Sequence, residues 1–187
     1  MRAERALKRL GLLLVLLLGT AADPAAPPEP AGFWTGPMHG AVPATITGGQ
    51  VVHTVELEAL LRHSDAVLID VTPAPRKPAG LAPNAVWMPA QHRNIASSVW
   101  LSDLGAGVLT AGQDTWFRAR LKELSRGKRD TPLVLYCHPQ CWASWNAAKR
   151  AIAEGYKRVH WYPDGVEAWQ DAGLPTQVAV AEGPGVQ

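Results

Sequence analysis

The chain has 187 residues, which is enough for one domain with a proper hydrophobic core. It carries 18 Lys and Arg residues against 16 Asp and Glu residues, for a net charge of +2. Four of the basic residues and one of the acids lie in residues 1–22, so the rest of the chain holds 14 basic and 15 acidic residues, a net charge of −1. The basic balance of the whole chain therefore belongs to its first 22 residues, and we infer no nucleic-acid partner from it.

Residues 1–22 have the three parts of a secretory signal peptide. A basic stretch at residues 1–9 precedes the apolar run Leu10–Leu18, and small residues follow at positions 19–22. The apolar run is shorter than the roughly 20 residues that a membrane span needs, which weighs against an uncleaved anchor. We therefore expect cleavage near Ala22, a periplasmic location and no membrane association after cleavage.

Residues 23–49 are rich in Pro, Ala and Gly and are predicted to form a linker or a loosely docked arm. Phe33 and Trp34 are the side chains that would pin this arm to the domain. Regular hydrophobic patterning begins at about residue 50. The elements predicted before the cysteines are a strand at 51–52, a helix over 55–62, an apolar strand over 66–71, a short strand at 85–88 and a helix over 114–125.

The only two cysteines lie between a predicted strand and a predicted helix. The apolar run Leu133–Tyr136 leads into Cys137, three residues intervene before Cys141, and a helical pattern follows. A cysteine at the end of a strand, before a helix N-terminus, lies where backbone N–H groups and the helix dipole favour a thiolate. A disulfide between Cys137 and Cys141 would close a very small loop, so it would be redox-active more than structural.

After the cysteine helix, a strand is predicted over 158–162 and a short helix over 166–172, and residues 177–187 are expected to form a flexible tail. Strands that alternate with helices at this short spacing predict an α/β sandwich around a mostly parallel sheet.

The order of these segments resembles the rhodanese family across residues 50–176. The strand ending in Asp70-Val71, the segment at 81–89, the strand that delivers Cys137 and the closing segment at 159–175 each resemble a family motif. The resemblance implies a rhodanese-like three-layer sandwich and a nucleophilic role for Cys137.

The chain resembles one bacterial subfamily more closely. That subfamily has a Cys-Trp signature and is associated with metabolism that depends on pyrroloquinoline quinone (PQQ). Cys137–Ala151 and Trp161–Gly165, which contains Asp164, are similar to that group. The resemblance implies an accessory role in PQQ-dependent alcohol oxidation, with a PQQ-dependent dehydrogenase or its transport system as partner.

Three chemical interpretations of the cysteine loop remain open. In the first, Cys137 is a sulfurtransferase nucleophile that carries a persulfide; the loop, however, has no arginine to bind an oxyanion such as thiosulfate. In the second, Cys141 resolves an oxidised Cys137 as a disulfide, and Trp142 and Trp145 stack on PQQ or another redox cofactor. In the third, the protein is a non-enzymatic binding partner of a dehydrogenase or transporter.

Five further residues are candidates for supporting roles. His138 is a candidate cofactor contact, and its place beside Cys137 makes joint metal ligation strained, so we predict no metal. Asp70 is expected to orient the loop or to cap the following turn. Arg76 and Arg93 are candidates to replace the missing loop arginine, and Asp164 is a supporting residue from the closing motif.

Overall fold

The structure is a computed structural model that describes residues 26–82 and 84–184. The expected signal peptide, with its cleavage near Ala22, lies outside the described residues. The helices and strands are β1 (Gln50–Val51), α1 (Thr54–His63), β2 (Val67–Asp70), β3 (Arg93–Ile95), β4 (Val99–Leu101), α2 (Ala111–Leu124), β5 (Leu133–Tyr136), α3 (Trp142–Ala153), β6 (Val159–Tyr162), α4 (Gly165–Asp171), β7 (Thr176–Val178) and β8 (Ala181–Glu182).

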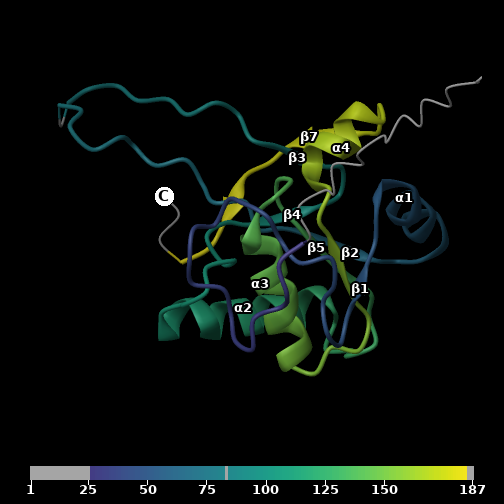
Figure 1. Cartoon of the computed structure of the whole chain (residues 1–187). Helices are drawn as coiled ribbons and strands as arrows, with labels where there is room; N and C mark the ends of the chain where they lie inside the picture. The colour runs from purple at the N-terminus through teal and green to yellow at the C-terminus, as the bar shows by residue number, and fades with distance from the viewer. Residues whose placement is uncertain (1–25, 83, 185–187) are drawn as a thin grey trace, which may run out of the picture.

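Six of the strands form one sheet in the order β1-β6-β5-β2-β4-β8, and every pairing in it is parallel. β3 and β7 form a separate antiparallel pair. The predicted α/β sandwich with a mostly parallel sheet is therefore confirmed (Figure 1).

The sheet is buried on both faces, and its central strand β5 is apolar at every position. In β5, Leu133 and Leu135 belong to one hydrophobic cluster, and Val134 and Tyr136 belong to another. The first cluster receives side chains of α2 and α3, and the second receives side chains of α1 and α4. Successive residues of a strand point to opposite faces, so this alternation makes the three layers.

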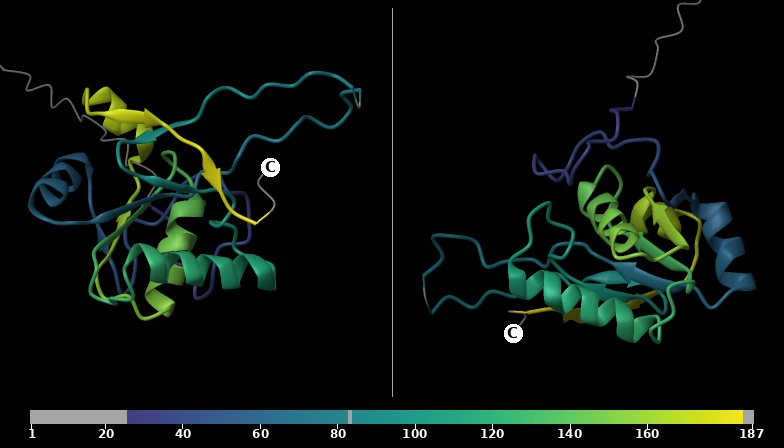
Figure 2. Two further views of the ribbon diagram at one scale, coloured as in Figure 1. Left: turned by 180° about the vertical axis from the view of Figure 1, so that it is seen from behind. Right: turned by 90° about the horizontal axis from the view of Figure 1, so that it is seen from below.

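Several elements differ from the sequence prediction. The segment at 85–88, predicted as a strand, forms no strand, and its Val86 and Met88 are exposed. It lies in the long connection between β2 and β3, which extends away from the body in both views of Figure 2. Residues 177–187, expected as a flexible tail, contain most of β7 and all of β8, which pair with β3 and β4.

The proline-rich arm contacts α3 over much of its described length, the purple trace in Figure 1. Lys149 donates to the carbonyls of Pro30 and Ala31, and the backbone N–H and C=O of Trp34 are both bonded to the Asn146 side chain. The arm is therefore part of the packed domain. No helix in the described part of the chain is long and apolar enough to cross a bilayer.

Candidate active site at the cysteine loop

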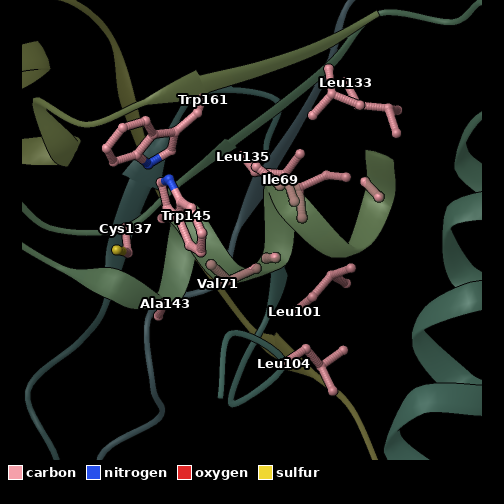
Figure 3. Packing of buried hydrophobic residues seen from close by; sticks show 14 of the residues in the cluster. Ile69, Val71, Leu101, Leu104, Leu133, Leu135, Cys137, Ala143, Trp145 and Trp161 are labelled. Atoms are coloured by element: carbon pink, nitrogen blue, oxygen red, sulfur yellow. The ribbon is translucent and has the colours of Figure 1, made fainter. Parts of the chain in front are cut away.

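Cys137 lies directly after β5 and is fully buried. Its sulfur lies 3.2 Å from the Ser144 hydroxyl oxygen and 3.5 Å from the Cys141 carbonyl oxygen. Burial, together with the interaction with Cys141, raises the pKa of Cys137 well above its ordinary value, because a thiolate is poorly solvated in the core. Figure 3 shows Cys137 among the packed side chains of this core, near Trp145 and Trp161. Cys137 is therefore held as a neutral thiol.

The pKa of Cys141 is shifted in the opposite direction, downward. Cys141 is the residue before α3, with an extended backbone, and its thiol is not bonded covalently to Cys137. A hydrogen bond from Cys137 lowers the pKa of Cys141 to about 6 against the opposing effect of burial, helped by the backbone of Ala143 and the charge of His39. The sequence resemblance implies a nucleophile at Cys137, whereas the electrostatics of the loop place the thiolate at Cys141.

Ser144 connects the two cysteines to the core and was missed by the sequence analysis. Its hydroxyl donates to the Cys141 carbonyl at 3.3 Å, accepts from the Trp161 indole N–H at 3.0 Å and lies 3.2 Å from the Cys137 sulfur. A buried hydroxyl that both donates and accepts hydrogen bonds fixes the positions of its partners. The only sequence signal was its place three residues after Cys141, one helical turn along α3.

The loop is held from outside by the first two residues of α4. Gly165 has a φ of +74°, and a Cβ atom on it would lie 2.5 Å from the backbone nitrogen of Pro139. The Val166 N–H donates to the Cys137 carbonyl at 3.0 Å. Asp164 contributes elsewhere: its carboxylate accepts from the Thr54 N–H at 3.1 Å and so caps α1.

The arm closes the site on its remaining side. The Met38 carbonyl accepts the Trp142 N–H at 2.8 Å, Gly40 donates to the Gln140 carbonyl at 2.9 Å, and His39 pairs with Cys141 as an isolated β-bridge. A helix N-terminus is the natural place for an anion in this kind of loop. Here, a carbonyl of the chain itself bonds to the Trp142 N–H.

The two candidate stacking tryptophans are both covered. Trp142 is 2% exposed and stacks on Trp34, and its ring makes an edge-to-face contact with the Trp145 ring at a centroid distance of 5.5 Å. Trp145 is fully buried and donates its indole N–H to the Thr45 carbonyl at 3.1 Å. Trp145 is thus a core residue, and neither face-to-face stacking on a cofactor nor contact with solvent is available to Trp142 while the arm is closed.

Two histidine–carboxylate pairs meet beside the loop. Asp70 is fully buried, caps its own turn by accepting the Thr72 N–H at 2.8 Å, and bonds to the His92 ring at 2.6 Å. His138 bonds to Glu167, and the His92 and His138 rings are 6.5 Å apart, edge to face. Asp70 therefore caps its turn, as one of its two expected roles requires; a role in orienting the cysteine loop stays a prediction. His92 and Glu167 were not predicted, because their positions depend on contacts across the fold.

The two candidate arginines are engaged with other groups. Arg93 donates to the side chain and the carbonyl of Thr176, within the β3–β7 pair. Arg76 is mostly exposed, forms a 2.9 Å ion pair with Asp103 and lines a cavity of about 290 Å³ together with Met38 and Ala143. Arg76 is thus near the first turn of α3, but its charge is already paired.

Among the described residues, no group of three or more His, Cys, Asp or Glu side chains is arranged to bind a metal ion. The site that remains is a pair of buried thiols with unequal acidity, together with the Ser144 hydroxyl, which contacts the Cys137 sulfur and the Cys141 carbonyl.

The fold and this loop define an α/β protein with a strand–cysteine–loop–helix unit at the carboxyl end of a parallel sheet. The Rhodanese-like domain model matches residues 53–172, more than half of the sequence. The chain belongs to the rhodanese-like domain family.

Solved structures with a similar fold are distant in sequence. Thiosulfate sulfurtransferase from Pseudomonas aeruginosa is 15% identical with a TM-score of 0.48, and the match covers 74% of this chain and 22% of that one. 3-Mercaptopyruvate sulfotransferase SseA from Escherichia coli is 18% identical with a TM-score of 0.47, and the match covers 73% of this chain and 54% of that one. The polysulfide-sulfur transferase homodimer from Wolinella succinogenes is 18% identical with a TM-score of 0.44, and the match covers 72% of this chain and 80% of that one. The match thus spans less than two thirds of the first two proteins. No curated protein matches this sequence.

Proposed function

We propose that this rhodanese-like protein is a thiol–disulfide redox protein that works through Cys141 and Cys137. The observation that carries the proposal is the placement of two free thiols on one short loop, Cys137 directly after β5 and Cys141 directly before α3. The pKa of Cys141 is lowered to about 6, and that of Cys137 is raised. A reactive thiolate beside a neutral thiol is the arrangement that thiol–disulfide exchange uses.

The exchange proceeds in two balanced steps. The Cys141 thiolate attacks one sulfur of a substrate disulfide, and the other sulfur leaves as a thiolate. Cys137 then gives up its proton and attacks the Cys141 sulfur, which forms the Cys137–Cys141 disulfide and releases the second substrate sulfur as a thiol. Two electrons pass from the protein to the substrate. The sequence spacing allows this bond, since only three residues separate the two cysteines.

The biological context rests on the resemblance to the Cys-Trp subfamily. It supports a periplasmic protein that assists PQQ-dependent alcohol oxidation by reducing or exchanging disulfides of a dehydrogenase or of its transport system. Binding of PQQ itself is the weaker alternative, since Trp34 covers Trp142.

Sulfur transfer is the second candidate, and one observation favours it. Cys137 occupies the strand-end position of the family nucleophile, with the Ser144 hydroxyl 3.2 Å from its sulfur. Its thiolate would attack the outer sulfur of thiosulfate, break the S–S bond, release sulfite and keep the sulfur as a persulfide. The arm weighs against this reaction, because the Met38 carbonyl bonds to the Trp142 N–H at the helix N-terminus.

Intact-mass measurements on the protein and on Cys137→Ser and Cys141→Ser separate the two reactions. Dithiol chemistry predicts loss of two hydrogens on mild oxidation, abolished by either substitution. It also predicts a mixed disulfide with a small aromatic disulfide that accumulates in Cys137→Ser and not in Cys141→Ser. Sulfur transfer predicts a gain of one sulfur with thiosulfate that only Cys137→Ser abolishes. If none of these products forms, the chain does not act through its thiols.

A non-enzymatic role is favoured by a different feature, the connection between β2 and β3. This connection exposes Leu81, Val86 and Met88, and it extends from the body (Figure 2). An exposed apolar extension is typical of a protein-binding surface. Co-elution with a purified PQQ-dependent dehydrogenase, lost in the double substitution Val86→Ser and Met88→Ser but retained without the cysteines, would support binding without thiol chemistry.

A further inference from the structure

A second polar site lies at the other end of the sheet, around His160 of β6. His160 is 6% exposed, and neither of its ring nitrogens has a hydrogen-bond partner among the described residues. Its neighbours in the sheet are Val134 and Gln50, near the amino ends of their parallel strands, whereas Cys137 follows the carboxyl end of β5. Buried polar groups are nearly always paired, so an unpaired imidazole needs an explanation.

His160 is one of the residues that line a cavity of about 440 Å³ between β6 and the turn before β1. Two glycines shape its wall. Gly48 has a φ of +85°, and a Cβ atom on Gly49 would lie 3.0 Å from the Val159 carbonyl oxygen, so the turn passes β6 without side chains. The volume is within the roughly 300–1,000 Å³ typical of small-molecule sites and far above the roughly 30 Å³ of one water molecule.

The cavity is cationic. Lys157 and Arg158 line it, both are exposed, and neither forms an ion pair with any described residue. None of the lining residues is acidic. Burial, followed by the charge of Arg158, lowers the pKa of His160, so at neutral pH the ring is uncharged and has one N–H to donate. Two cations and a neutral donor form a site for a negatively charged group.

We propose that this cavity binds a small oxyanion, either a phosphate or a carboxylate group, between Lys157, Arg158 and the imidazole of His160. Both ring nitrogens are shielded from solvent in the structure. Binding therefore includes a rotation of the imidazole about its Cβ–Cγ bond, which turns an N–H toward the cavity. The site uses neither cysteine and is independent of the redox chemistry proposed above.

The test is a titration of the purified chain, followed by NMR correlations of the imidazole nitrogens and by the melting temperature. The probes are inorganic phosphate, glycerol phosphate and acetate, each compared with chloride at equal ionic strength. We expect a saturable change in the His160 signals and a rise in melting temperature with at least one oxyanion. Preference for glycerol phosphate over inorganic phosphate would indicate an organic ligand, and a response to acetate alone would indicate a carboxylate. Signals that follow ionic strength only would overturn the inference.

Three variants test which residues act. His160→Leu removes the N–H donor and also removes the buried ring nitrogens that have no hydrogen-bond partner. Without anion the variant should therefore have a higher melting temperature than the parent, and it should bind the anion at least about tenfold more weakly. Arg158→Gln should weaken binding about two- to fivefold, as expected for an exposed cation. Lys128→Gln, an exposed cation beside a different cavity, is the matched control and should change nothing. An anion response of the same affinity in His160→Leu and Arg158→Gln would show that the anion binds elsewhere.

Discussion

Trp34 of the arm and Trp142 of the cysteine helix stack face to face, with ring centroids 4.4 Å apart and planes 13° from parallel. The two residues are 108 positions apart in the sequence. Their stacking joins the arm to the residue that follows Cys141 and covers one face of the Trp142 ring. Thiol chemistry at this loop therefore depends on how often the arm opens, because Cys141 is 2% exposed while it is closed.

Loosening the arm should expose Cys141. The Asn146 side chain accepts the Trp34 N–H at 2.8 Å and donates to the Trp34 carbonyl at 3.0 Å, so Asn146→Ala leaves both groups unpaired. We expect a loss of about 1–3 kcal/mol in unfolding free energy and a severalfold faster alkylation of Cys141 by iodoacetamide. Peptide mapping of the alkylated protein checks the site. Asn84→Ala, on the exposed connection between β2 and β3, is the control; equal alkylation rates in the two variants would show that the arm does not limit access.

The acidity of Cys141 makes its reactivity depend on pH. Its pKa is lowered to about 6, first by the hydrogen bond from Cys137, so the alkylation rate should rise as pH increases through about 6 and then level off. An ordinary thiol would instead rise through a pH of about 8.5. Cys137→Ala removes the donor and should move the midpoint upward. An unchanged midpoint in that variant would assign the acidity to the helix N-terminus alone.

The same shift stabilises the fold in a defined pH range. The folded-state pKa of Cys141 lies below the unfolded value, so ionised Cys141 contributes stability above the unfolded pKa, and this contribution is lost as pH falls through about 6. Urea denaturation of the protein and of Cys141→Ser across this range measures it. The difference in unfolding free energy between them should grow from pH 6 to pH 8, and a constant difference would contradict the thiolate assignment.

The sequence predicts the centre of this fold well and its borders poorly, for physical reasons. β5 and α3 are recognisable locally because a buried parallel strand is apolar at every position and a helix repeats every 3.6 residues. The arm has no such period, and its position depends on Trp34 meeting Asn146, which lies 112 residues further along the chain. The apolar run at 85–88 has the composition of a strand but finds no partner strand.

The candidate site likewise has features that the sequence predicts and features that it does not. Both cysteines were located because strand, loop and helix are adjacent in sequence, whereas the distribution of charge between them depends on burial, which sequence does not specify. His92 joins Asp70 across 22 residues of irregular chain, so no local pattern indicated it. Trp142 was predicted to stack on a cofactor because it is a tryptophan beside Cys141. In the structure Trp34 of the arm stacks on it instead, and the docking of the arm was not predictable from the sequence.

Removing the Asp70 carboxylate should be costly. Asp70→Ala leaves the Thr72 N–H and the His92 ring without their acceptor in a buried position, and we expect a loss of about 3 kcal/mol in unfolding free energy. Asp130→Ala, in an exposed turn, should remain within about 0.5 kcal/mol of the parent. Urea denaturation measures both. If the thiols of Asp70→Ala are alkylated at the parental rate, the carboxylate supports the fold and does not position the loop.

Gly165 tests whether the N-terminus of α4 holds the cysteine loop in place. Gly165→Ala adds a Cβ atom 2.5 Å from the Pro139 nitrogen and strains a residue at a φ of +74°. Gly173→Ala is a matched control, because Gly173 has a φ of +70° and no atom within 4 Å of the added Cβ. Gly173→Ala should cost about 1 kcal/mol from backbone strain alone, and Gly165→Ala about 2 kcal/mol more from the clash. Only Gly165→Ala should also change the midpoint pH of Cys141 alkylation, since displacing the loop alters the hydrogen bond from Cys137. Equal costs and equal midpoints in the two variants would show that the loop keeps its geometry without this contact.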